Sequence, residues 1–152
     1  PKTPKPQRLW FEFNFSKMDA TVFGDTLVIY APVSEADQKA YTEACEEAKQ
    51  NNVDLPKKPS CYKDVHIADL PPCQYVTVLF TAEYCPPCQA FAQPFQEFVD
   101  TVNKDSNRMQ VVVVNCDKRR EEFDEHVKKL SDKFLCVPFE QSEVAIKLED
   151  MA

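Results

Sequence analysis

The sequence predicts an α/β fold, and two apolar runs with the segments that follow them carry that prediction. Residues 75–81 and 109–114 are rich in β-branched and apolar side chains, which is typical of buried strands, and we expect residues 75–81 to form a central strand. Each run is followed by apolar residues spaced three and four apart, which indicates a helix packed on one face. The order strand, helix, strand, helix between residues 75 and 134 therefore predicts a parallel pair of strands with a right-handed crossover.

Length and charge narrow the function classes. The chain has 152 residues, enough for one domain with a substantial core or for a small domain with an extension. A net charge of −7 argues against a nucleic-acid binder, which needs a basic face. No apolar run approaches the ~20 residues of a membrane-spanning helix. We therefore expect no nucleic-acid partner and no membrane span.

The N-terminal part begins with an arm and two predicted strands. Residues 1–7 contain proline and lysine with nothing to bury, so they indicate an extended arm. Residues 9–15 place apolar side chains at every second position, and residues 26–31 form a short apolar run. Both patterns indicate strands, with a turn between them at Gly24.

A helix and a linker complete this part. Ser34 is suited to cap a helix that runs to about Gln50, because its side chain can accept a hydrogen bond from the first turn. The asparagines, prolines and lysines that follow indicate a linker. We therefore divide the chain into an N-terminal extension at residues 1–59, with a Pro/Lys arm, two strands and one helix, and a main domain at residues 60–152.

The main domain opens with a short strand and turn at residues 65–72, which precede the central strand. After the strand, a helix with a kink at Pro94 is expected to carry one continuous apolar stripe. The stripe consists of Phe91, Phe95, Phe98 and Val102.

A second helix starts at Arg119 and also carries an apolar stripe. Its members are Phe123, Val127, Leu130 and Phe134. His126 falls on the polar side of this helix, and we expect it to face solvent. The segment at residues 135–139 ends the helix, and residues 142–151 indicate a last one.

Two cysteines follow the central strand directly. Cys85 and Cys88 stand two residues apart at the start of a helix, which in a chain without a secretory signal favours a redox pair. Cys85 would be the exposed sulfur, its thiolate stabilised by unpaired backbone N–H groups and the helix dipole, and Cys88 the buried resolving sulfur. Pro86 and Pro87 remove backbone donors and stiffen the turn. We expect no cofactor beyond this pair and no metal.

The chain has seven cysteines, an odd number that does not suit a secreted disulfide framework. With no recognisable signal peptide, this favours a reducing intracellular compartment, either the cytoplasm or the mitochondrion. Cys61 and Cys73 with the pair would make four thiolates, but their spacing does not match the two C-x-x-C pairs of a zinc site. Cys45, Cys116 and Cys136 are expected to be packing residues. The alternative to a redox-active pair is that Cys85 and Cys88 are an inactive remnant of such a motif.

The stretch Thr81-Ala-Glu-Tyr-Cys-Pro-Pro-Cys88 resembles the active-site motif of the thioredoxin superfamily. It is most similar to the tryparedoxin and nucleoredoxin branch, which uses Trp-Cys-Pro-Pro-Cys. The resemblance covers about residues 62–152 and implies a thioredoxin-like sheet flanked by helices. It also implies Cys85 and Cys88 as catalytic residues, with Tyr84, Pro86 and Pro87 as the rest of the motif.

The sequence departs from the family pattern at several points, three of which bear on the active site. Tyr84 replaces the usual tryptophan, and Gln89 replaces the usual basic residue after the second cysteine. The family's loop with a cis-proline is not found before Ala152, so we expect the domain to be incomplete at its C-terminus.

The sequence-based function prediction is a thiol–disulfide oxidoreductase that reduces protein or small-molecule disulfides through the CPPC pair. One alternative is a thioredoxin-fold accessory subunit of a large assembly, mitochondrial or cytoskeletal, with a little-used active site. A further alternative is a binding module whose N-terminal extension docks a protein partner under control of the redox pair.

Overall fold

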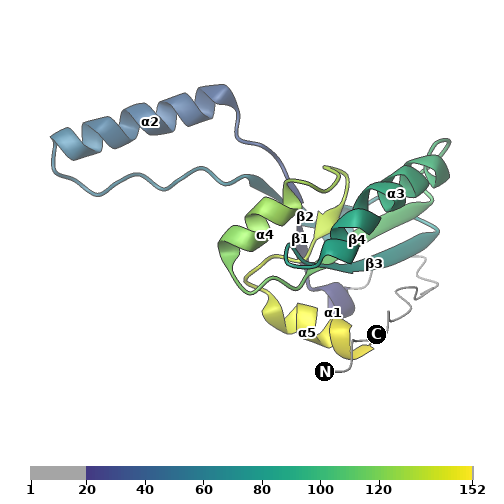
Figure 1. The fold of residues 1–152 in the computed structure, drawn as a ribbon. Coiled ribbons are helices and arrows are strands. Elements are labelled where there is room, and N and C mark those ends of the chain that lie inside the picture. Colours follow the sequence, from purple (N-terminus) through teal and green to yellow (C-terminus); the bar gives the residue numbers. More distant parts are fainter. Residues whose placement is uncertain (1–19, 152) are drawn as a thin grey trace.

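The computed structural model describes residues 20–151, which form one sheet with helices on both faces (Figure 1). The predicted arm at residues 1–7 and the predicted strand at residues 9–15 lie outside the described residues. The elements in chain order are α1 (Ala20–Phe23), β1 (Thr26–Tyr30), α2 (Glu35–Gln50), β2 (Tyr62–His66), a 3-10 helix (Ile67–Asp69), β3 (Tyr75–Thr81), α3 (Pro86–Val102), β4 (Met109–Asn115), α4 (Arg120–Val127), β5 (Leu135–Cys136) and α5 (Ser142–Met151).

The sheet has five strands in the order β2-β1-β5-β4-β3. β3, β4 and β5 are parallel, with Val78 opposite Val112 in the β3–β4 pair, which confirms the predicted parallel pair. β1 is antiparallel to both of its neighbours, β2 and β5. The sheet is therefore mixed, and the segment with Cys85 and Cys88 follows a strand of its parallel half.

β1 lies inside the sheet, although the sequence analysis assigned it to the N-terminal extension. Val28 pairs with Asp64 of β2 on one side and with Cys136 of β5 on the other. The alternation of side chains along a strand reports its two faces and says nothing about its partners in pairing. The sheet thus includes a strand from residues 1–59.

β3 was predicted to be a central strand, but within residues 20–151 it forms the end of the sheet and pairs only with β4. Val76 and Leu79 are nevertheless buried, because helices cover parts of both faces of the strand. An apolar run indicates that the side chains of a strand are buried. It does not indicate how many strands pair with it, so the prediction of a central position did not follow from the run.

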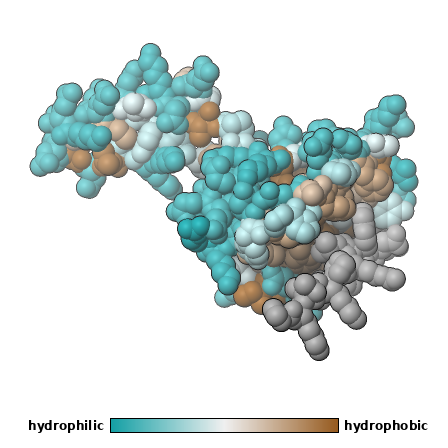
Figure 2. Space-filling view, in the orientation of Figure 1, coloured by the Kyte–Doolittle hydropathy of each residue, from teal (hydrophilic) through white to brown (hydrophobic). Residues whose placement is uncertain are grey.

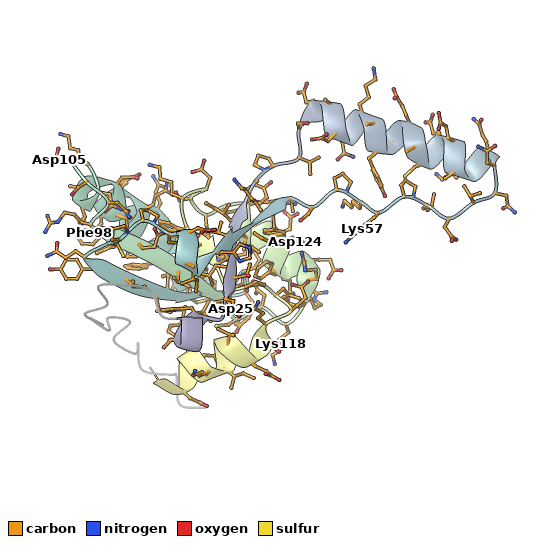
Figure 3. All side chains as sticks on the ribbon, turned by 180° about the vertical axis from the view of Figure 1, so that it is seen from behind. Asp25, Lys57, Phe98, Asp105, Lys118 and Asp124 are labelled. Atoms are coloured by element: carbon orange, nitrogen blue, oxygen red, sulfur yellow. A yellow bond between two sulfur atoms is a disulfide. The ribbon has the colours of Figure 1, made fainter. Side chains whose placement is uncertain are left out.

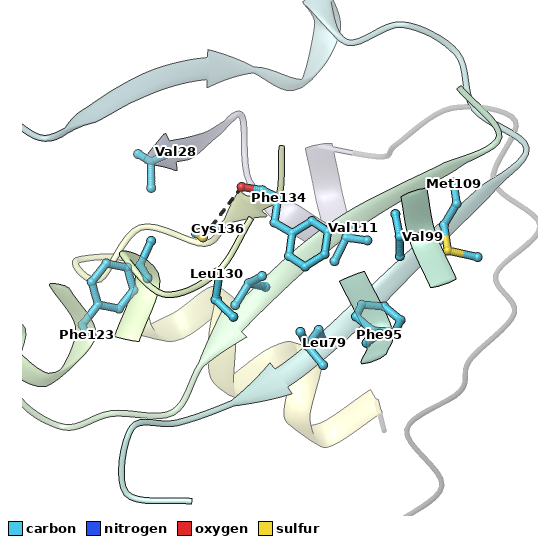
Figure 4. Packing of buried hydrophobic residues seen from close by; sticks show 12 residues of the cluster. Val28, Leu79, Phe95, Val99, Met109, Val111, Phe123, Leu130, Phe134 and Cys136 are labelled. Carbon is cyan, nitrogen blue, oxygen red and sulfur yellow. Dashed lines mark hydrogen bonds between the residues drawn. The ribbon is translucent and has the colours of Figure 1, made fainter. Parts of the chain in front are cut away.

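Helices cover both faces of the sheet (Figure 1). α3 and α4 lie on one face, where their side chains meet Val111 and Val113 of β4 (Figure 4). α1 and α5 lie on the other face and pack against Val112 and Val114. Because β4 is buried on both faces, its residues form a continuous valine run instead of alternating with polar residues.

The predicted stripe on α3 is only partly correct. Phe95 is buried and packs against Phe134 with ring centroids 5.9 Å apart, but Phe91 and Phe98 are 39% and 45% exposed. Val99 takes the buried place one turn after Phe95. A helix on a flat sheet face buries a narrow line of side chains, so the flanking aromatic residues stay partly in solvent.

The stripe predicted from Arg119 onward is buried throughout, although α4 ends at Val127. Leu130 and Phe134 reach the core from the turn that follows the helix. The turn predicted at Gly24 is confirmed, since this residue has φ +79 and joins α1 to β1. Glycine adopts that backbone conformation without steric cost, which other residues do not.

α2 and the segment that returns from it form an arm that projects away from the sheet, defined here as residues 32–60 (Figures 1 and 2). Ser34 caps α2 as predicted, and its Oγ accepts from the Asp37 backbone N–H at 3.1 Å. The returning segment, marked by Lys57 in Figure 3, runs beside α2. Ala48 is the buried residue of α2, and among the described residues the helix has no extensive contact with another helix or strand. No helix in residues 20–151 is long and apolar enough to cross a membrane.

Candidate functional site

Cys85 and Cys88 follow the carboxyl end of β3, where the chain turns into α3. Cys85 is the N-cap residue of α3, with extended backbone angles, and Cys88 lies in the first turn. Their Sγ atoms are bonded at 2.04 Å, so the structure holds the pair as a disulfide. The spacing therefore brings the two sulfurs together as the sequence indicated.

The backbone at the start of α3 offers the Cys85 sulfur fewer donors than the sequence analysis expected. Pro86 and Pro87 occupy the first two helical positions and have no N–H. The N–H groups of Cys88 and Gln89 both donate to the carbonyl oxygen of Cys85, at 3.0 and 3.1 Å. Stabilisation of a Cys85 thiolate thus falls mainly to the dipole of the helix.

The motif residues stand at the surface. Tyr84 is 64% exposed, and Pro86 and Pro87 are exposed as well. Cys85 and Cys88 are both partly exposed, so Cys88 is not the fully buried sulfur that the sequence analysis predicted. The roles of attacking and resolving sulfur are therefore assigned from the positions of Cys85 and Cys88 along the helix and not from a difference in burial.

Glu83, two residues before Cys85, is the centre of a hydrogen-bond network. Its backbone N–H donates to both carboxylate oxygens of Asp117, each at 3.0 Å. Its carbonyl oxygen accepts from the Gln89 side-chain amide. Its carboxylate pairs with Lys129 and with His126. Groups from the β4–α4 loop, α3 and α4 therefore hold the turn that precedes Cys85.

His126 was predicted to face solvent, and this is wrong: the residue is 1% exposed. Nδ1 lies 3.1 Å from Glu83 Oε2, and Nε2 lies 2.8 Å from Thr81 Oγ1. A carboxylate only accepts hydrogen bonds, so a neutral His126 carries its proton on Nδ1 and accepts the Thr81 hydroxyl proton at Nε2. The spacing Phe123, His126, Val127, Leu130 already contained this residue, but its polarity led to its assignment to the outer face.

An open cavity of about 430 Å³ lies beside the site, between α3 and α4. Its lining consists of Gln89, Ala92, Gln93, Gln96, His126, Lys129 and Leu130. Among the described residues, no group of three or more His, Cys, Asp or Glu side chains is arranged to hold a metal ion.

The remaining cysteines are free thiols in different surroundings. Cys136 is buried, as predicted, and burial raises the pKa of its thiol to about 12. Cys116 is half-buried and donates to Glu149 Oε1 at 3.3 Å. Its pKa is also raised to about 12, first by burial and then by Glu149. Cys45 is partly exposed on α2.

These differences predict an order of alkylation. In the reduced native protein at pH 8, iodoacetamide should modify Cys85 first, because the helix dipole favours its thiolate. Cys116 and Cys136, whose thiols have pKa values raised to about 12, should stay unmodified longest. Mass spectrometry of timed samples gives the order, and the same reaction in denaturant is the control in which all thiols react. Modification of Cys136 as fast as of Cys45 would contradict the prediction.

Glu83 predicts a pH dependence of stability. Its pKa lies below the ordinary value of 4.5, first because of the hydrogen bond from Lys129 and then because of His126. A carboxyl group with a lowered pKa in the folded state stabilises the fold above its unfolded pKa, and this contribution is lost as the pH falls below about 4.5. Glu83→Gln should therefore be less stable than the parent at pH 7 and approach it at pH 3, as measured by urea unfolding.

Glu125→Gln is the matched control for this experiment, because Glu125 pairs with Lys128 on the exposed side of α4. Exposed ion pairs contribute little to stability, so this variant should follow the parent at every pH. If the Glu83→Gln variant and the parent lost stability in parallel as the pH falls, the assigned role of the Glu83 carboxylate would be wrong.

Comparison with known proteins places the chain in a family. The sequence model of the family described as thioredoxin-like matches residues 73–151, more than half of the chain. No curated protein matches. Similar solved structures include tryparedoxin I from Crithidia fasciculata, with 34% identity over 50% of this chain and 51% of that chain and a TM-score of 0.45. Others are thioredoxin from Wuchereria bancrofti, with 33% identity, and tryparedoxin from Trypanosoma brucei, with 28%, at the same coverages and TM-score.

The chain thus spans about half the length of these solved proteins. The family match runs from just before β3 to the end of α5 and includes the turn with both cysteines. The match agrees with the resemblance of residues 81–88 to the thioredoxin superfamily motif. It also confirms the predicted thioredoxin-like sheet flanked by helices. We conclude that the chain belongs to the thioredoxin-like family.

Proposed function

We propose that this protein is a thiol–disulfide oxidoreductase that reduces protein or small-molecule disulfides through Cys85 and Cys88. The observation that carries the proposal is the position of the pair. Cys85 caps α3 at its N-terminus, partly exposed, and lies within bonding distance of Cys88 one turn into the helix. A thiol at a helix N-terminus is more acidic than a free one, and an exposed one can reach a substrate.

The reaction begins with the reduced pair. The Cys85 thiolate attacks one sulfur of the substrate disulfide, and the other substrate sulfur leaves as a thiolate. The Cys88 sulfur, after loss of its proton, then attacks Cys85 Sγ and expels the second substrate sulfur. Two electrons pass to the substrate, its two thiolates take up two protons, and the pair becomes the disulfide seen in the structure. An external dithiol must reduce the pair before the next turnover.

The surroundings of the pair support substrates that approach from solvent. Tyr84 and the two prolines form an exposed rim around Cys85, which leaves access for a protein segment or a small disulfide. The chemistry uses no cofactor beyond the cysteines themselves. The five free cysteines among the described residues fit a reducing compartment, and we place the protein inside the cell, in the cytoplasm or the mitochondrion.

Insulin reduction with dithiothreitol as the electron donor tests this proposal. Cys85→Ser should lose the protein-dependent rate, because the attacking sulfur is absent. Cys88→Ser, reduced beforehand and mixed with insulin after dithiothreitol is removed, should stop after one step and accumulate a mixed disulfide on Cys85, visible by mass spectrometry. Cys45→Ser is the matched control on the distant α2 and should keep the parent rate. A Cys85→Ser variant as active as the parent would refute the proposal.

A second candidate function has one observation in its favour, the projecting arm at residues 32–60. We propose, as the alternative, that the protein is an accessory subunit of a large assembly and uses the arm as a protein contact. α2 has 16 residues, good helix formers and a cap, but most helical stability in proteins comes from tertiary packing, and α2 receives little of it from the sheet. A neighbouring subunit would supply that support.

The apparent mass of the protein in native extract distinguishes this alternative. The parent should migrate with a large assembly in size-exclusion chromatography, and a variant with residues 32–60 replaced by Asn-Gly should migrate alone. The replacement is suited to the fold because the Ala31 N–H already donates to the Cys61 carbonyl at 2.8 Å across the base of the arm. A cooperative unfolding transition serves as its folding control. A parent protein that migrates as a free monomer would exclude the subunit role.

A further inference from the structure

We propose that His126 is a positioning residue for the Cys85–Cys88 pair, which it serves by tying both ends of the Thr81–Glu83 segment to α4. The inference rests on the redox function proposed above and deepens it, because it names a residue that controls the redox equilibrium of the pair. His126 touches neither sulfur in any hydrogen bond of the described residues, so its action passes through the turn.

The two contacts of His126 span the segment that leads to the pair. Thr81 is the last residue of β3, and Glu83 lies two residues before Cys85. One ring nitrogen contacts the Thr81 hydroxyl at 2.8 Å and the other contacts the Glu83 carboxylate at 3.1 Å. A single rigid ring therefore sets the distance between the end of the strand and the residue that begins the approach to Cys85.

Burial makes this tie stronger than the other contacts of Glu83. His126 and Thr81 are 1% and 3% exposed, so breaking either bond would leave a polar group in the core without a partner. Lys129, which also pairs with Glu83, has a side chain that is 54% exposed, and solvent and salt screen its interaction. Among the side chains that hold the Glu83 carboxylate, His126 is thus the one fixed by the core.

The position of the turn matters for Cys85 because of the two prolines. Pro86 and Pro87 supply no N–H, and the N–H groups of the next two residues are used by the Cys85 carbonyl. A Cys85 thiolate then depends on the helix dipole, whose effect falls off within one turn. A loosened turn moves the sulfur away from the helix end, destabilises the thiolate and shifts the dithiol–disulfide equilibrium toward the disulfide.

The experiment compares variants of His126 in the full chain. His126→Phe removes both hydrogen bonds and keeps a ring. His126→Asn places a donor near the position of Nδ1 and keeps the Glu83 contact, whereas His126→Gln places a polar group near Nε2 and keeps the Thr81 contact. Val127→Ala is the matched control, because Val127 is the next residue of α4, is equally buried at 1%, and packs in the core.

Three quantities are measured for each variant. The first is the equilibrium of the pair with a glutathione redox buffer, the second is the pKa of the Cys85 thiol in a Cys88→Ser background, and the third is the melting temperature. His126→Phe should shift the equilibrium about threefold to fivefold toward the disulfide, the size of a typical helix-end charge effect. The pKa of the Cys85 thiol should rise by about half a unit for the same reason.

Val127→Ala should lower the melting temperature and leave the equilibrium and the thiol pKa at their parent values. The Asn and Gln variants should fall between the parent and His126→Phe, and they decide the question if the Phe variant fails to fold. If the His126 variants lose stability like Val127→Ala but keep the parent equilibrium and thiol pKa, the residue is structural only and the proposal is overturned.

The outcome is separable from that of the proposed function, since neither the equilibrium nor the thiol pKa requires turnover. A parent protein that fails to reduce insulin, with His126 variants that still shift the equilibrium, would refute the oxidoreductase function and keep the positioning role. An active parent with an unshifted equilibrium in all His126 variants would refute only the positioning role.

Discussion

The complete burial of the valine run in β4 is the constraint on which the rest of this structure depends. Val111, Val112, Val113 and Val114 are each at most 1% exposed, so both faces of the sheet must be covered at this strand. α3 and α4 meet that requirement on one face, and α1 with α5 on the other. Because β3 runs parallel to β4, the segments that leave the two strands emerge at the same edge of the sheet.

That shared edge creates the candidate site. The turn after β3 carries Glu83 and Cys85, and the loop after β4 carries Asp117, which accepts the Glu83 N–H. α4 then returns across the sheet and brings His126 beneath the same turn. The cysteine pair is therefore held by contacts from distant parts of the chain, although its two members are close in sequence.

The molecule combines this tightly packed site with an arm that has little packing at all. The sheet around β4 has two apolar cores, whereas Ala48 is the buried residue of α2 and belongs to neither core. The arm is inserted between two paired strands, β1 and β2, whose ladder closes its base. An insertion at such a position changes the surface of the protein without disturbing the core, because the strands on both sides keep their register.

Local sequence determined the identity of most elements and the chemical core of the site. The valine run indicated β4, the cap at Ser34 and the spacing of apolar residues indicated helices, and the Cys-Pro-Pro-Cys stretch after an apolar run placed a cysteine pair at a helix start. These features depend on side-chain periodicity and on residues within one helical turn of each other, so they are visible in the chain alone.

Only the tertiary structure decided which elements meet. β1 lies between β2 and β5, β3 ends the described sheet, and His126 is buried against the turn before Cys85. The places of the two strands do not follow from periodicity, because pairing depends on segments far away in sequence; the spacing on α4 allowed a buried His126 but did not name its partners. A histidine on a helix is compatible with solvent or with the core, and the choice is made by the partners that the fold brings to its two nitrogens.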